Sequence, residues 1–256
     1  MSRGAEAPLV DVRTEAGVRV LTLRREAKLN ALSADLERAL AEALAHDEAR
    51  GAACVVLTGS GRAFSAGADV DELQRTPEAV LEYYEATGGL YEQLAALPQP
   101  TLSAIAGYCL GGGLELALAT DFRIADETAV FGFPEVGLGI LPSSGGTERI
   151  TRLLGPARAK ELILLRERID ARDALAYGLV SEVVPAGEAL DRALSLGRRL
   201  AELPRHAVAL AKQAIEAVPE SSRAAGILIE RLAYATLAQT AGARAAAEAF
   251  ERRRGR

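Results

Sequence analysis

The twenty residues from Thr101 to Thr120 contain a single charged side chain, Glu115. The rest of the segment is apolar or small, and three consecutive glycines, 111–113, come just before the glutamate. A charge buried among apolar residues is costly unless it is paired or used. Apolar surroundings also disfavour the ionised form of a carboxylic acid, which raises its pKa towards neutrality. The segment must therefore fold into the interior of a protein, and Glu115 is a candidate for proton transfer.

A second segment repeats this arrangement. Between Thr128 and Thr147 the only charged residue is Glu135, which lies in the sequence Phe-Gly-Phe-Pro-Glu-Val-Gly. Two isolated carboxylates of this kind are typical of an acid/base pair. The alternative is that each glutamate pairs with an arginine such as Arg123 or Arg149 and has only a structural role. The pattern alone leaves both interpretations open.

The glycines before Glu115 point to an anion site. A glycine turn at the start of a helix leaves backbone N–H groups free at the positive end of the helix dipole. The run 111–113 lacks the Lys-Ser/Thr of a P-loop and the spacing of a dinucleotide fingerprint, so a developing oxyanion fits better than a phosphate. A comparable turn at 64–69 follows a buried strand and could supply a second N–H. Most glycine-rich loops are only turns, so this signal is weak by itself.

Strand-like and helix-like segments alternate along the first half of the chain. This order favours an α/β protein with a largely parallel sheet. From Gly145 onward, helix-like blocks separated by Gly and Pro predict a mostly helical C-terminal third. The segments in the first half are a hairpin formed by 9–14 and 18–23, a helix after Ser33 that ends near His46 and Asp47, buried strands at 53–58 and 101–106, a helical stretch at 77–97 and a further strand at 122–125.

Composition narrows the function classes. A chain of 256 residues can bury a large core, and a net charge of −5 argues against a dedicated nucleic-acid binder. Residues 1–8 do not resemble a signal peptide, and no run of about 18 apolar residues occurs. Cys54 and Cys109 lie in apolar runs and are expected in the core rather than in a disulfide. A cytoplasmic protein is therefore expected.

Several ordered motifs resemble those of the crotonase, or enoyl-CoA hydratase/isomerase, family. The resemblance extends over nearly the whole chain. It implies the crotonase fold, a spiral of repeated ββα units expected in residues 1–195, and a helical region in 196–256 that packs trimers, often paired as hexamers. The motifs are Leu-Asn-Ala-Leu at 29–32, Val-Leu-Thr-Gly at 56–59, Ala-Phe-Ser-Ala-Gly-Ala-Asp at 63–69, the segment 107–117, Phe-Gly-Phe-Pro-Glu at 131–135 and Gly-Gly-Thr-Glu-Arg at 145–149.

The resemblance also assigns roles. The N–H groups of Ala68 and Gly112 would form an oxyanion hole for the thioester carbonyl of an acyl-CoA. Glu115 would act as the base on a water molecule and Glu135 would supply a proton to Cα, which describes an enoyl-CoA hydratase of β-oxidation. No metal or redox cofactor is implied, because coenzyme A is part of the substrate. Further substrate contacts are expected at Arg25, Lys28, Ala66, Asp69, Gly111, Pro134, Ser143 and Arg253.

The sequence departs from the family pattern at some positions. Arg24-Arg25-Glu26 replaces the usual Arg-Pro before the Asn-Ala-Leu motif, and Ser143 stands where the family usually has glycine. Tyr83, Tyr84 and Tyr91 could line an acyl pocket, although packing in the core or exposure at the surface is the favoured interpretation.

Other functions remain as alternatives. An isomerase would use Glu135 alone, and a hydrolase or decarboxylase would release free coenzyme A or carbon dioxide. A more remote alternative is a non-catalytic oligomer that binds coenzyme A or RNA, suggested by the arginines at 252–254.

Overall fold

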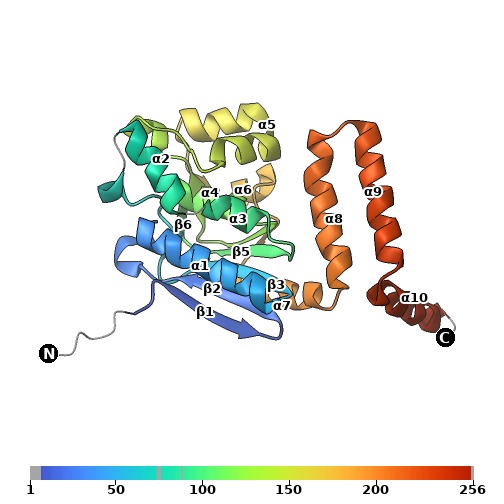
Figure 1. Ribbon diagram of the computed structural model, residues 1–256. Coiled ribbons are helices and arrows are strands. Elements are labelled where there is room, and N and C mark those ends of the chain that lie inside the picture. Colours follow the sequence, from blue (N-terminus) through green and yellow to red (C-terminus); the bar gives the residue numbers. More distant parts are fainter. Residues whose placement is uncertain (1–6, 74–75, 88, 255–256) are drawn as a thin grey trace.

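The computed structural model describes residues 7–73, 76–87 and 89–254. Its strands form two sheets, and successive turns of the chain add one strand to each (Figure 1). The larger sheet has the order β1 (Val10–Glu15), β2 (Val18–Leu23), β3 (Cys54–Gly59), β5 (Thr101–Ile105), β7 (Phe122–Asp126) and β10 (Glu182–Val184). The smaller sheet has the order β4 (Ala63–Ser65), β6 (Tyr108–Leu110), β8 (Val130–Gly132) and β9 (Ile169–Asp170).

Each strand pair is followed by helix, which produces the spiral of ββα units. The pairs β3/β4, β5/β6 and β7/β8 lead into α2 and α3, α4, and α5, respectively. Within the larger sheet all pairs except β1/β2 are parallel. The helices are α1 (Ala34–Arg50), α2 (Pro77–Ala86), α3 (Leu90–Ala95), α4 (Gly112–Leu118), α5 (Gly146–Leu164), α6 (Ala171–Tyr177), α7 (Ala189–Ala201), α8 (Arg205–Ala217), α9 (Arg223–Ala238) and α10 (Ala241–Arg254), with 3-10 turns η1 (Glu26–Lys28), η2 (Val70–Glu72), η3 (Glu135–Leu138) and η4 (Val218–Glu220).

Apolar packing on both faces fixes the larger sheet. On one face, Leu36, Leu40 and Leu44 of α1 are fully buried, as their spacing of four predicts. On the other face, Ala193 and Leu194 of α7 pack in a second cluster with residues of β2, β3, β5 and β7. Strands covered on both sides tend to have continuous apolar runs, which is the pattern of Cys54–Leu57 in β3, whereas β5 also buries Thr101 and Ser103. Both cysteines are buried and free, as expected.

The N-terminal hairpin is confirmed with a one-residue shift. Its strands pair antiparallel from Val10 opposite Leu23 to Glu15 opposite Val18. The two turn residues, Ala16 and Gly17, have φ values of 47° and 79°. Positive φ at both positions is the turn geometry that matches the twist of a hairpin.

Some boundaries differ from the sequence prediction. The single helix expected at 77–97 is two helices, because Gly89 adopts a left-handed conformation, φ 63°, at the start of α3. Helix α1 continues to Arg50 beyond the stop expected at His46 and Asp47, since polar residues do not by themselves end a helix. The smaller sheet was not predicted: its strands have two or three residues, too few for a periodic pattern.

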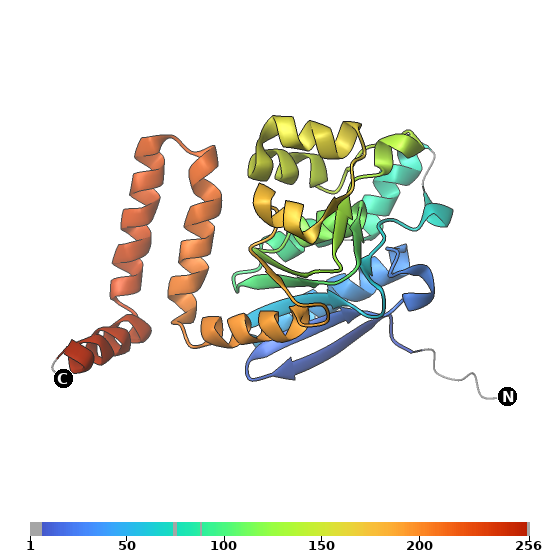
Figure 2. The same cartoon turned by 180° about the vertical axis from the view of Figure 1, so that it is seen from behind.

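The last three helices form an arm beside the core. Helices α8 and α9 run antiparallel next to each other, and α10 lies at their foot (Figures 1 and 2). Lys212 of α8 forms an ion pair of 2.9 Å with Asp121 at the start of β7, which attaches the arm to the core. The expected division at 195/196 falls inside α7, whose Gly197 packs against Val18 and Cys54. No helix in the described ranges is long and apolar enough to cross a membrane.

Candidate active site

Glu115 lies in the first turn of α4 with only 4% of its surface exposed. Its Oε1 accepts hydrogen bonds from the backbone N–H groups of Ser144 and Gly146, both at 2.8 Å. Gly146 is the first residue of α5, which is regular up to a kink at Gly155, so the carboxylate lies at the positive end of the first segment of this helix. Oε2 accepts no hydrogen bond from the described residues. One oxygen is therefore held in place while the other remains available for chemistry.

Glycine at position 146 makes this contact possible. A Cβ built there would lie 2.6 Å from both Cγ and Oε1 of Glu115. No real side chain tolerates such a distance, so only glycine lets the helix backbone approach the carboxylate this closely.

Glu135 begins η3, directly after β8 and Pro134, and is 8% exposed. Its carboxylate lies against Gly111, where a Cβ would be 2.7 Å from Oε1. Gly111 has φ 51° and comes immediately before α4. Oε2 of Glu135 is buried and has no hydrogen-bond partner among the described residues. The second glutamate therefore lies beside the start of the helix that carries the first.

The two carboxyl groups lie in different environments, which give them different pKa values. Burial raises the pKa of Glu115, but the N–H groups of Gly146 and Ser144 and the charge of Arg149 oppose the rise. Burial raises the pKa of Glu135 to about 7, and the negative charge of Glu115 adds to that rise. Glu115 is thus the group that ionises more easily, and Glu135 can carry a proton near neutral pH. Such a pair can act as base and acid.

The purely structural interpretation of the glutamates required pairing with Arg123 or Arg149. Arg123 instead donates to the carbonyl oxygens of Leu179 and Thr120. Arg149 binds Glu92 and the Ser144 carbonyl. Within the described residues neither arginine forms an ion pair with Glu115 or Glu135.

Two backbone N–H groups converge near these carboxylates. A Cβ on Gly112 would lie 3.4 Å from the nitrogen of Ala68, and a Cβ on Gly67 would lie 3.3 Å from the nitrogen of Gly112. In the part of the chain that the structure describes, neither the Ala68 nor the Gly112 N–H donates to a protein acceptor. Two free donors this close together can bind one oxyanion.

The loop that carries Ala68 is held by a residue that the sequence prediction did not single out. Asn30 is fully buried and donates through Nδ2 to the carbonyl oxygens of Ser60 and Ala63. Two residues further on, Leu32 forms an isolated parallel β-bridge with Ala68, and its backbone N–H donates to the Gly67 carbonyl at 2.8 Å. The backbone of Asn30 is left-handed, with φ 54°. Asn is one of the non-glycine residues that adopt this conformation most often, so an asparagine in this motif was a sequence signal for a tight turn.

The basic residues expected to contact coenzyme A are paired with carboxylates. Arg25 binds Asp69 at 2.6 Å and also donates to the carbonyl of Ala31, so it ties the Ala68 loop to the segment around Asn30. Lys28 binds Asp71 at 2.6 Å, and both side chains are half or more exposed. Lys28 is therefore the more accessible of the two, and a phosphate contact by either one stays a prediction.

The other expected contacts have varied surroundings. The Ala66 N–H donates to the Leu29 carbonyl at 2.9 Å. The Ser143 hydroxyl forms a hydrogen bond of 2.5 Å with the Tyr84 hydroxyl of α2. Arg253 belongs to α10, but its side chain lies outside the described residues.

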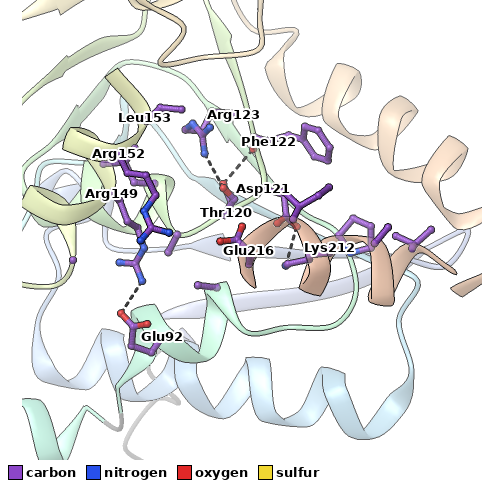
Figure 3. A pocket seen from close by; sticks show the side chains of 18 of the residues that line it. Glu92, Thr120, Asp121, Phe122, Arg123, Arg149, Arg152, Leu153, Lys212 and Glu216 are labelled. Atoms are coloured by element: carbon purple, nitrogen blue, oxygen red, sulfur yellow. Dashed lines mark hydrogen bonds and ion pairs between the residues drawn. The ribbon is translucent and has the colours of Figure 1, made fainter. Parts of the chain in front are cut away.

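A cavity of about 990 Å³ opens between the core and α8 (Figure 3). It is lined by residues of α3, α5, β7 and α8, among them Glu92, Arg149, Asp121 and Lys212. Neither Glu115 nor Glu135 lines it, although Gly145 and Arg149 border both the cavity and the loop that binds Glu115. The cavity therefore lies beside the two carboxylates and does not contain them.

The fold and the site define a class of α/β protein in which two buried carboxylates meet a pair of free backbone N–H groups. The model of the enoyl-CoA hydratase/isomerase family matches residues 13–255. A protein of Rhizobium meliloti named a probable enoyl-CoA hydratase is 40% identical over 244 residues, covering 95% of each chain. The crystal structure of enoyl-CoA hydratase from Bacillus anthracis superimposes with a TM-score of 0.91 at 37% identity, covering 96% of each chain. The chain belongs to the enoyl-CoA hydratase/isomerase family and has the crotonase fold.

Proposed function

We propose that the protein is an enoyl-CoA hydratase, which adds water to a trans-2-enoyl-CoA to give a 3-hydroxyacyl-CoA. The observation that carries this proposal is the presence of two buried carboxyl groups with separated proton affinities next to two converging N–H donors. An isomerase needs only one such carboxyl group, whereas addition of water uses a base and an acid.

The thioester carbonyl accepts hydrogen bonds from the N–H groups of Ala68 and Gly112. When water adds to the β-carbon, negative charge moves to this oxygen as the enolate forms. Fixed donors stabilise the enolate more than the substrate, and one donor of this kind is typically worth about 3 kcal/mol.

Glu115 and Glu135 move the protons. Glu115, ionised and oriented through Oε1, takes a proton from the attacking water through its free Oε2. Glu135 donates a proton to the α-carbon as the enolate collapses, and its pKa of about 7 allows it to hold that proton near neutrality. One proton is taken and one is given, so proton exchange with water restores the pair. This chemistry uses only groups of the chain, and no metal or redox cofactor is proposed.

The direct test is hydration of crotonyl-CoA, followed by the loss of its conjugated absorbance. We expect the wild-type protein to be active and both Glu115→Gln and Glu135→Gln to lose roughly 10³-fold or more in kcat, as when an acid or base is removed. Release of free coenzyme A or carbon dioxide would indicate a hydrolase or decarboxylase. Conversion of a 3-enoyl-CoA without hydration, retained in Glu115→Gln, would indicate an isomerase.

The arm is proposed to assemble the protein into a trimer or a pair of trimers. Its helices expose several large apolar side chains, which on a soluble monomer usually mark a contact surface. We also propose that the substrate is a coenzyme A thioester, that the protein acts in β-oxidation and that it is cytoplasmic. Size-exclusion chromatography with light scattering tests the assembly. The most exposed apolar residues of the arm are Ile215, Leu228, Leu232, Tyr234 and Phe250.

A further inference from the structure

Arg149 of α5 is bonded to the turn that binds Glu115. Its Nη1 donates a hydrogen bond of 3.0 Å to the carbonyl oxygen of Ser144. The N–H of the same serine donates to Oε1 of Glu115 at 2.8 Å. The backbone N–H of Arg149 also donates to the Gly145 carbonyl at 2.8 Å. A displacement of this turn away from Glu115 would therefore have to break or distort its bonds to Arg149.

The guanidinium of Arg149 also packs against Gly145, the residue between the two N–H donors of Glu115. Gly145 has φ 91°, and a Cβ built there would overlap Nη1 of Arg149. The arginine side chain thus fills the space beside the turn formed by residues 144–146. The conformation that presents both N–H groups to the carboxylate depends on this packing as well as on the hydrogen bonds.

The guanidinium is fixed at its other end by Glu92 of α3. Nη2 of Arg149 lies 2.7 Å from Oε1 of Glu92 (Figure 3). Two other glutamates of the cavity wall, Glu148 and Glu220, bind Arg152 instead, at 2.9 and 3.0 Å. One planar group therefore binds α3 and the turn at the same time, a task that suits the fixed fork of a guanidinium better than an ammonium group.

The charge of Arg149 favours the ionised form of Glu115, as a base requires. Burial raises the pKa of Glu115, whereas the N–H groups of Gly146 and Ser144 lower it, and the positive charge of Arg149 lowers it further. Arg149 therefore acts on the carboxylate in two ways, through the turn and through its charge.

The groups that interact with Glu115 from three other elements add no positive charge. They are Glu135 of η3, Glu37 of α1 and Tyr91 of α3. Burial raises the pKa of each, and the negative charge of Glu115 adds to that rise. The favourable charge at Glu115 therefore comes from the side of α5.

We propose that Arg149, held in place by Glu92, is a positioning residue for the hydration reaction. It fixes the turn that orients Glu115 and supplies positive charge near this base. The inference rests on the proposed hydratase function, because Arg149 acts on the reaction only through Glu115. A purely structural link between α3 and α5 would stabilise the fold and leave the properties of the base unchanged.

The test follows hydration of crotonyl-CoA by Arg149→Gln, Arg149→Lys, Glu92→Gln and the double variant Arg149→Gln/Glu92→Gln. The measured quantities are kcat, KM and the pH profile of kcat/KM. Arg152→Gln is the matched control, because it removes one positive charge from the same helix and the same cavity wall. The carboxylates that bind Arg152 are Glu148 and Glu220, outside the turn. Thermal unfolding of each variant checks that it folds.

We expect Arg149→Gln to lower kcat at its optimal pH by about tenfold to 100-fold and to change KM by less than about threefold, because the base is misplaced while substrate contacts remain. The acid limb of its kcat/KM profile should move to higher pH, since Glu115 loses a charge that favours its ionised form. Arg149→Lys should restore the acid limb and only part of kcat, because an ammonium group keeps the charge but lacks the planar fork.

Glu92→Gln should lower kcat by about threefold, and the double variant should lose no more than Arg149→Gln, because both changes act through the same guanidinium. Arg152→Gln should leave kcat and the acid limb unchanged.

Two outcomes would overturn the inference while the hydratase function stands. One is a folded Arg149→Gln with the kcat and acid limb of the wild type, whatever its unfolding temperature, as a purely structural link would produce. The other is an equal shift of the acid limb in Arg152→Gln, which would assign the effect to the overall charge of the helix. If Arg149→Gln does not fold, wild-type kcat in both Arg149→Lys and Glu92→Gln overturns the inference. A wild-type protein inert towards all enoyl thioesters, or a fully active Glu115→Gln, would instead overturn the proposed function.

Discussion

Oε1 of Glu115 accepts a 2.8 Å hydrogen bond from the N–H of Gly146, the first residue of α5. The contact joins residues 31 positions apart and gives the proposed base both its orientation and a favourable dipole. The catalytic geometry therefore depends on the approach of α5 to α4.

Gly146→Ala tests this dependence. The added Cβ would meet Glu115 at 2.6 Å and force the carboxylate out of place. We expect kcat for crotonyl-CoA to fall by about 100-fold, since small misplacements of catalytic groups have effects of this size. Overpacking should also lower the free energy of unfolding by about 1–3 kcal/mol. In the control Gly242→Ala, a Cβ near the start of α10 has its nearest contact at 3.4 Å, so activity should be preserved. Full activity of Gly146→Ala would contradict the proposed orientation of Glu115.

The pKa of Glu135 predicts how activity depends on pH. As the acid, Glu135 must be protonated, so kcat/KM for hydration should fall as pH rises above about 7. Glu115 must be ionised, so kcat/KM should also fall on the acid side. A bell-shaped profile measured with crotonyl-CoA checks both limbs, and the alkaline limb should disappear in the residual activity of Glu135→Gln.

The same shift predicts how stability depends on pH. The folded pKa of Glu135 lies above the unfolded value, so the folded state holds the proton more tightly. The stability that this carboxyl group contributes is present in acid and is lost as pH rises through about 7. Glu135→Gln should therefore be more stable than the wild type at pH 8, and the difference should shrink towards pH 5. Urea titrations at the two pH values measure it, and a difference independent of pH would contradict the burial of an ionising carboxyl group.

Sequence reasoning found the groups that carry charge but not what orients them. Glu115 and Glu135 were identifiable because each is the only charge in a long apolar segment. The bonds from Ser144 and Gly146 were not, because they depend on how distant segments return to α4. The burial of Glu37 in α1 was not predicted either: it lies next to Leu36 on a helix rich in charge, where a glutamate normally belongs to the solvated face. Only the position of Tyr91 shows that this glutamate faces the interior.

Arg25 and Lys28 should differ when each is changed to glutamine. Arg25 is 23% exposed and its partner Asp69 only 4%, so Arg25→Gln leaves a buried carboxylate without its partner. We expect Arg25→Gln to lower the free energy of unfolding by about 2–4 kcal/mol. The Lys28 pair is exposed, so Lys28→Gln should change stability by less than about 1 kcal/mol.

If Lys28 binds a phosphate of coenzyme A, KM should rise in Lys28→Gln and the salt dependence of KM should weaken. An unchanged KM would exclude that contact.

Ser143 and Tyr84 should act as one unit. Their hydroxyl groups are 2.5 Å apart and join α2 to the loop whose next residue, Ser144, donates to Glu115. Removing either hydroxyl breaks the same hydrogen bond. Tyr84→Phe, Ser143→Ala and the double variant should therefore show nearly equal losses of stability and of activity. Because the link is partly exposed and neutral, we expect a loss of about 1 kcal/mol in the free energy of unfolding and a few-fold loss in kcat. A double-mutant cycle for both quantities measures the coupling. Additive losses would show that the two hydroxyl groups act independently and that Ser143 does not transmit the position of α2 to the proposed base.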